Sequence, residues 1–193
     1  MGNREDLLAG ARKVIIERGV ANATARDIAA AAGVSLAAIG YHFGSKERLL
    51  TAALTDAVGT AIGDGMGDLI REGAGRPALD SFAHMWNGIP RIFAANREAI
   101  LASFENSLRI VRDPDAQQQM NAAISEAHRG IAEDLRAAHP QLTDDQAQAL
   151  AQLDFVLVQG LALLWLLSPD GDVPSGDRLA DAITALTTPP PAE

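Results

Sequence analysis

Apolar residues recur along most of the chain at intervals of three and four, the spacing of one face of a helix. The first such stretch runs from Arg4 to Arg18, and its apolar face consists of Leu7, Leu8, Ala11, Val14 and Ile15. Stretches with a period of two are missing, and Pro, Gly and Ser separate the helical patterns. The chain is therefore expected to be all-α, with about nine helices.

The other expected helices span residues 25–32, 35–42, 46 into the 60s, 77–95, 97–111, 114–138, 144–167 and 177–186. The helix that starts at Lys46 contains four glycines, each of which weakens it by about 0.5–1 kcal/mol: Gly59, Gly63, Gly65 and Gly67. This helix either ends near Gly63 or continues as a soft helix. Residues 187–193 are expected to form a frayed tail.

The composition is that of a folded globular protein, with 48% hydrophobic and 21% charged residues among 193. No cysteine is present, which excludes a disulfide scaffold and a thiolate metal site. The net charge of -9 is unevenly distributed: residues 1–48 hold seven Lys or Arg and five acids, whereas the rest holds nine and 20. The N-terminal end therefore tolerates a polyanion that the remainder repels.

The chain carries no sign of export or of a membrane span. Its first twenty residues mix charges with apolar positions, unlike a signal peptide. The most apolar stretch, residues 155–167, is too short to span a bilayer and contains Gln159. We expect a cytoplasmic protein with a buried helix at this position.

Residues 24–43, TARDIAAAAGVSLAAIGYHF, meet the requirements of two helices joined by a tight turn. Thr24 can cap the first helix, with Asp27 three residues later returning the hydrogen bond. Gly33 supplies the backbone freedom that the turn needs. A shared apolar wedge is expected from Ile28, Val34 and Ile39.

Small side chains on the outside of the second helix would let it enter a DNA major groove. The next helix follows Gly44 and Ser45, and Lys46 in its first turn would form a phosphate clamp with the helix N-terminus. Further phosphate contacts can come from Arg26, Tyr41 and His42. The expected DNA-contacting residues are Thr24, Arg26, Ser35, Leu36, Ala37, Ala38, Tyr41, His42 and Lys46.

This region, about residues 4–55, resembles the DNA-binding domain of the TetR family of bacterial transcriptional regulators. The resemblance rests on Thr24, Arg26, Ile28, Ala29, residues 32–35 (AGVS), residues 41–43 (YHF), residues 45–47 (SKE), Leu49 and Leu50. It implies a helix-turn-helix repressor that binds a palindromic operator in double-stranded DNA as a homodimer and is released by a small-molecule effector. Ala37 and Gly40 depart from the family pattern, so the operator sequence is not implied.

On this basis we expect a three-helix DNA-binding domain at residues 1–48 and a larger helical ligand-binding and dimerisation domain at residues 49–193. Apolar and polar residues of the middle helices are candidates for the effector pocket, or else they fill the core. Acidic Glu105 and Asp154 could pair with a cationic ligand, or be solvated or bound to Arg. The candidate pocket residues are Phe82, Met85, Trp86, Ile89, Phe93, Phe104, Leu108, Met120, His128 and Gln159.

The second half of the helix at 144–167 is apolar nearly all the way round, so it must be covered on both sides. The final helix offers one apolar face, formed by Leu179, Ala182, Ile183 and Leu186. Two such helices from each of two chains could form a four-helix interface.

Signatures of an enzyme are missing: the sequence has no nucleophile elbow, phosphate loop or acid pair. The histidines are too scattered to suggest a metal site, and no cofactor is expected. Two alternatives stay open. The chain could be an all-α dimeric interaction protein without sequence-specific DNA binding, or a transcriptional activator.

Overall fold

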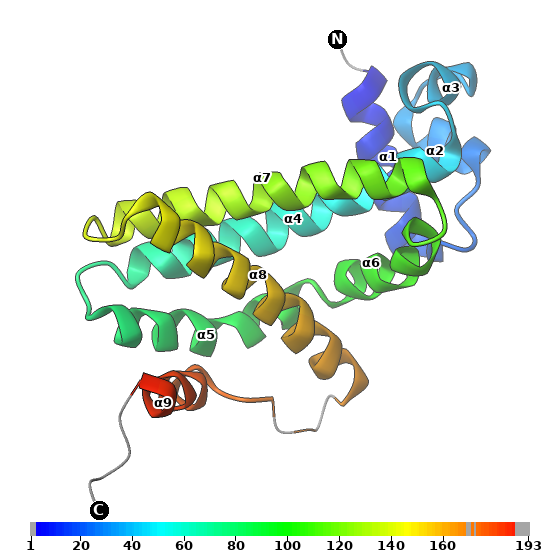
Figure 1. The fold of residues 1–193 in the computed structure, drawn as a ribbon. Coiled ribbons are helices and arrows are strands. Elements are labelled where there is room, and N and C mark those ends of the chain that lie inside the picture. Colours follow the sequence, from blue (N-terminus) through cyan, green and yellow to red (C-terminus); the bar gives the residue numbers. More distant parts are fainter. Residues whose placement is uncertain (1–2, 169–170, 172, 188–193) are drawn as a thin grey trace, which may run out of the picture. The chain divides into compact units, whose positions relative to one another are not determined.

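The computed structural model describes residues 3–168, 171 and 173–187, and these residues form helices joined by short turns (Figure 1). The described helices are α1 (Asn3–Arg18), α2 (Ala25–Ala32), α3 (Ala37–Phe43), α4 (Lys46–Glu72), α5 (Ala78–Ala95), α6 (Arg97–Ile110), α7 (Pro114–Ala138), α8 (Asp144–Leu167) and α9 (Gly176–Thr187). The expectation of an all-α chain with about nine helices is confirmed for this part of the chain. The expected tail, apart from Thr187, lies outside the described residues.

The helices group into two compact units. Unit 1 comprises residues 1–61 and 96–125, and unit 2 comprises residues 62–95 and 126–193. Helices α4 and α7 therefore contribute one part to each unit. The expected division into a DNA-binding domain at residues 1–48 and a ligand-binding and dimerisation domain at residues 49–193 stays a prediction.

Unit 1 is built around the packing of α1 on α2. Leu7, Ile28 and Leu49 are completely buried at its centre. Gly10 permits the close approach: a Cβ there would lie 2.9 Å from both the backbone nitrogen and the Cβ of Ala32, and 2.9 Å from the carbonyl oxygen of Ile28. A side chain larger than hydrogen at this position would force the two helices apart.

The caps and the turn around α2 and α3 form at the residues that favour them. The Thr24 side chain caps α2 by accepting a hydrogen bond from the Asp27 amide at 3.1 Å. The helix ends at Gly33, whose φ of 67° lies in the left-handed region that glycine adopts easily. Ser45 Oγ then accepts from the Arg48 amide at 3.1 Å at the start of α4. The sequence-based assignments of these caps and of the turn are confirmed.

Polar contacts in unit 1 fix the first turns of α4. Arg109 of α6 donates to the Glu47 carbonyl oxygen at 2.9 Å and also to the hydroxyl of buried Thr51. Arg48 forms an ion pair with Asp115 of α7. The start of α4 is thereby held by two other helices of the same unit.

Helix α4 continues through all four of its glycines to Glu72, so the alternative that it ends near Gly63 is wrong. Two of these glycines allow close packing: a Cβ on Gly65 would lie 2.7 Å from Ile92 Cδ1, and one on Gly67 would lie 2.7 Å from Asp134 Oδ2. A Cβ on Gly59 or Gly63 would point into open space. Close packing against neighbouring side chains therefore explains two of the four glycines in α4, Gly65 and Gly67.

Unit 2 contains α5, α8, α9 and the remaining parts of α4 and α7 (Figure 1). Helix α9 packs against α5. At this contact the Gly176 amide donates to Asn87 Oδ1 at 2.8 Å, and a Cβ on Gly176 would overlap the Ala83 carbonyl oxygen. Phe93 of α5 packs on Trp165 of α8, with ring centroids 5.9 Å apart.

Helix α8 is capped at Thr143, with Gln146 completing a reciprocal pair of hydrogen bonds. It is long and apolar enough to cross a membrane by composition, but it serves as a core helix of unit 2, which buries Ala147, Ala151, Asp154, Val158, Leu161 and Ala162. In the single described chain part of its apolar second half is exposed, and cover on both sides with the help of a second chain stays a prediction. Its exposed leucine and valine side chains, the α8 apolar surface, are Leu153, Val156, Leu163, Leu164 and Leu167.

The contact at Gly10 yields a stability prediction. Gly10→Ala should destabilise unit 1 by about 1–3 kcal/mol, because the added methyl meets backbone atoms that cannot rotate away. Gly59→Ala in α4 is the control and should stabilise the protein by about 0.5–1 kcal/mol, since its methyl enters open space. Urea unfolding measures both changes; equal stabilisation by the two alanines would contradict this account of the helix contact.

Candidate functional site

The outer face of α3 and the two residues before it are exposed. Tyr41 is 86% exposed and Leu36 is 50% exposed, while Ser35 and Ala37 are exposed beside them. Ala38 differs from the expectation, because it is only 9% exposed and packs in the core of unit 1. The expected exposure of Ala38 is therefore wrong: it lies on the inner side of α3 with Ile39, and both side chains pack in the core of unit 1.

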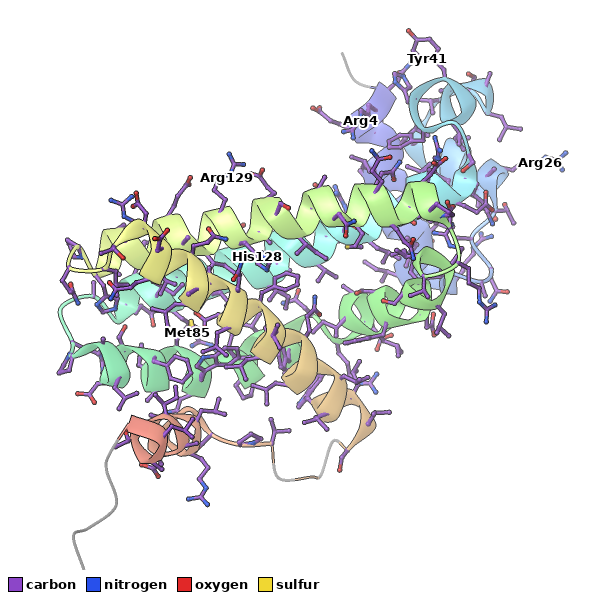
Figure 2. All side chains as sticks on the ribbon, viewed as in Figure 1. Arg4, Arg26, Tyr41, Met85, His128 and Arg129 are labelled. Carbon is purple, nitrogen blue, oxygen red and sulfur yellow. The ribbon has the colours of Figure 1, made fainter. Side chains whose placement is uncertain are left out.

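A shallow hollow of about 500 Å³ lies along this face of α3. Five of the residues that the sequence predicted to contact DNA line it with two residues of α1, and the full set is Asn3, Arg4, Ser35, Ala37, Ala38, Tyr41 and His42. The sequence-based prediction missed Arg4. Its guanidinium carbon lies 5.3 Å from the centroid of the Phe43 ring, and Figure 2 shows Arg4 beside Tyr41.

Two residues near α2 have different surroundings. Besides capping the helix, the Thr24 hydroxyl donates to Asp27 Oδ2 at 2.6 Å, and this hydrogen bond, with the charge of Arg18, lowers the pKa of Asp27. Thr24 thus has a structural role in unit 1. Arg26 is exposed, and its side chain extends away from α2 (Figure 2).

Lys46 also has partners within unit 1. Its ammonium group donates to the carbonyl oxygen of Ala23 at 3.1 Å and lies 3.6 Å from Glu47 Oε1. It therefore links the start of α4 to the loop before α2. An ammonium group has three N–H donors, so these contacts leave capacity for a phosphate oxygen.

Unit 2 contains a cavity of about 240 Å³ between α4, α5, α7, α8 and α9. Of the ten residues expected in an effector pocket, Phe82 and Met85 line it. The remaining lining is mostly aliphatic, and the full set is Ile70, Ala78, Leu79, Ser81, Phe82, Met85, Leu135, His139, Leu142, Leu150, Asp154 and Ile183. Figure 2 labels Met85 on α5.

The other eight expected pocket residues lie outside this lining. Within unit 2, Trp86, Ile89 and Phe93 are buried core residues, His128 packs on the Phe155 ring at 4.9 Å and Gln159 is exposed. Three belong to unit 1: Phe104, Leu108 and Met120. The apolar character of these three residues predicted that they are buried or pack against other residues, but it did not predict which unit they belong to.

Three polar side chains line the cavity. His139 Nε2 and Ser81 Oγ are 3.0 Å apart and form a hydrogen bond. Asp154 is 1% exposed, and its Oδ1 has no hydrogen-bond partner among the described residues. Burial raises the pKa of Asp154 to about 7, and a neighbouring side chain, Trp86, lowers it only in part.

Comparisons with known proteins agree with the fold and with the helix-turn-helix. The family model described as bacterial regulatory proteins, tetR family, matches residues 7–53. HTH-type transcriptional regulator TtgR from Pseudomonas putida is 29% identical over 189 residues, covering 92% of this chain and 85% of the relative.

Two further relatives match different extents of the chain. HTH-type transcriptional repressor AcnR from Corynebacterium efficiens is 42% identical over 52 residues, which cover 27% of this chain and 28% of the relative. The crystal structure of multidrug binding protein EbrR complexed with ethidium shares the fold, with a TM-score of 0.66, 23% identity and coverage of 95% of this chain and 97% of that one.

The family match falls on the helices whose caps, turn and exposed face are described above, and the similarity to TtgR continues through both units. Members of this family are regulators of transcription rather than enzymes. The chain carries, at residues 7–53, the DNA-binding domain of the TetR family of bacterial transcriptional regulators.

Proposed function

We propose that this regulator is a cytoplasmic repressor that binds a palindromic operator as a homodimer and leaves it when a small molecule occupies the cavity of unit 2. The observation that carries the proposal is the exposed face of α3, where Ser35 and Ala37 stand beside Tyr41 above a hollow of about 500 Å³. A face with small side chains at its centre lets a helix approach base edges closely.

Cations around α3 support a DNA-binding role. Arg4 lines the same hollow as Tyr41, and Arg26 is exposed on α2, the first helix of the helix-turn-helix. In helix-turn-helix proteins the first helix of the motif contacts the backbone while the second reads bases. We therefore assign Arg4 and Arg26 to phosphates, and Ser35, Leu36, Ala37 and His42 to the groove. Lys46 is assigned to a phosphate as well as to the Ala23 carbonyl.

The α8 apolar surface supports the homodimer. Val156 is 66%, Leu164 53% and Leu167 72% exposed in the single chain, although α8 is the most apolar helix. An apolar surface of this kind is typical of an interface. A second copy that presents its own α8 would cover it, and Leu186 of α9, 88% exposed, would add to the same contact.

The effector site is proposed from the unit 2 cavity. Its walls come from five helices and are apolar apart from three polar side chains, as in binding sites for small molecules. EbrR, described as a multidrug binding protein, has been crystallised with imidazole, proflavin and ethidium. AcnR, which matches the DNA-binding end, is described as a repressor.

A mobility-shift titration with the DNA upstream of the protein's own gene tests the proposal. A discrete complex that weakens steeply with salt is expected, because phosphate contacts release counterions. Weak smearing without a discrete complex would instead favour the interaction protein without sequence-specific DNA binding.

Arg26→Ala should weaken binding to all DNA sequences alike and reduce the slope of log affinity against log salt by about 2, because each of the two subunits loses one phosphate contact. Arg129→Ala is the control: Arg129 is exposed on α7, paired with Glu126, and should leave the slope unchanged. An unchanged slope in Arg26→Ala would contradict the assignment of Arg26 to a phosphate.

Ser35→Ala should change the preference among sequences at one position of each half-site by about 1–3 kcal/mol, because a base-edge hydrogen bond is lost. Binding to random DNA should stay the same. Selection of preferred sites from a randomised pool measures both quantities. Identical selected sites for wild type and Ser35→Ala would remove Ser35 from the reading face.

Leu164→Glu should shift the protein from dimer to monomer at micromolar concentration, because a charge would be buried without a partner in the proposed interface. Leu108→Glu is the matched control, since Leu108 is 69% exposed on α6 and lies outside the α8 apolar surface. Sedimentation velocity measures the mass, and circular dichroism checks that both variants fold. A dimeric Leu164→Glu would place the interface elsewhere.

A further inference from the structure

The most unusual group outside the helix-turn-helix is the carboxyl of Asp154, which is 1% exposed and lines the unit 2 cavity from the middle of α8. Isolated carboxylates are rarely buried in apolar surroundings, because removing the charge from water is unfavourable. The Lys and Arg side chains of the described chain do not line the cavity, and Asp154 Oδ1 has no hydrogen-bond partner among the described residues. The carboxyl is thus a buried acid that lacks a counter-ion.

The neighbours of Asp154 favour its ionised form once a counter-ion is supplied. The indole N–H of Trp86 lies near the carboxyl and lowers the pKa of Asp154 in part as a hydrogen-bond donor, although the two groups do not reach normal hydrogen-bond geometry. A protonated carboxyl would need an acceptor for its hydroxyl. The other polar side chains of the lining, Ser81 and His139, are hydrogen-bonded to each other.

The walls suit an organic cation. Phe82 lines the cavity and packs against Trp86 with ring centroids 6.0 Å apart, so an aromatic pair lies next to the acid. Aromatic faces attract cations, most strongly where water is excluded. The rest of the lining consists of aliphatic side chains and Met85, which suit the apolar part of a ligand.

We propose that the unit 2 cavity binds compact lipophilic monocations, with Asp154 as the counter-ion and the ring of Phe82, which packs on Trp86, against the cationic group. The inference rests on the proposed function of unit 2 as the effector-binding unit. It adds the chemical class of the effector and the residue that selects it.

Binding of such a cation is coupled to a proton. Burial raises the pKa of Asp154 to about 7, so the free protein carries this carboxyl largely protonated below that pH and ionised above it. A monocation favours the ionised form, so binding below pH 7 releases the proton to the buffer. The lining from α4, α5, α7 and α9 is uncharged, and His139, which follows α7, is the other ionisable group there.

The test uses the full-length protein and a matched pair of probes, benzyltrimethylammonium and its neutral isostere neopentylbenzene, which differ by one nitrogen. Titration calorimetry should show benzyltrimethylammonium binding about tenfold more tightly at pH 8 than at pH 6, as expected for a single carboxyl with a pKa near 7. Repetition in buffers of different ionisation enthalpy should show release of close to one proton at pH 6 and almost none at pH 8. Neopentylbenzene should not bind more tightly at pH 8 than at pH 6.

Asp154→Asn preserves the shape of the side chain and removes its charge. It should weaken benzyltrimethylammonium binding at pH 8 at least tenfold, abolish the dependence on pH and leave neopentylbenzene binding within about twofold. Retention of the pH dependence in Asp154→Asn would show that another group causes it and would overturn the proposal. Equal affinity of wild type for both probes at pH 8, or no binding of the cation, would overturn it as well.

The wild-type measurements alone can overturn the proposal if Asp154→Asn fails to fold. Addition of benzyltrimethylammonium to the DNA complex separates this inference from the function on which it rests. Binding of the cation with the DNA complex left intact would contradict release by the effector while the cation site stands. A discrete operator complex together with no cation binding would contradict the cation site alone.

Discussion

The close contact of α1 with α2 at Gly10 is the constraint on which the DNA-binding end depends. Backbone and Cβ atoms of α2 lie 2.9 Å from the position that a Gly10 side chain would occupy, so the two helices meet through their backbones. This contact and the fully buried Leu7, Ile28 and Leu49 form the base of the helix-turn-helix. The exposed side chains of α3, among them Tyr41 at 86% exposure, are free to bind because the inner side chains fix the helix.

Unit 2 follows a different principle, since its distinctive group is polar and buried. Burying the Asp154 carboxyl makes the folded protein less stable than an apolar residue of similar size would at this position. The raised pKa of Asp154 reflects the same unfavourable removal of its charge from water. Groups of this kind are common at functional sites. Asp154 of α8, with its unpartnered Oδ1, and Phe82 of α5, which packs on Trp86, line the same cavity. A binding role explains why an acid stands there.

Much of the fold could be predicted from the sequence, because helix periodicity, caps and turn residues are local properties. The cap at Thr24, the turn at Gly33 and the start of α4 after Ser45 depend on neighbours a few residues away. Contacts between distant residues could not be predicted in this way. The Lys46 ammonium meets the Ala23 carbonyl, and Arg4 reaches the face of α3 only because α1 packs against that helix.

The ligand site was predicted less well than the helix-turn-helix for the same reason. Aromatic and apolar residues of the middle helices indicate burial, but the contacts between helices decide which of them border a cavity. Phe82 and Met85 do so, whereas Phe104 belongs to the other unit. Asp154 stood out in the sequence as an acid in an apolar stretch, and its lack of a partner became visible only with its neighbours in place.

Methylation protection of the operator tests the central claim, that α3 reads the major groove, most directly. Dimethyl sulfate modifies guanine N7, which lies in that groove. The bound protein should protect guanines in two tracts about one helical turn, about 34 Å, apart on one face of the duplex. A salt-sensitive complex that leaves every guanine N7 reactive would contradict the claim.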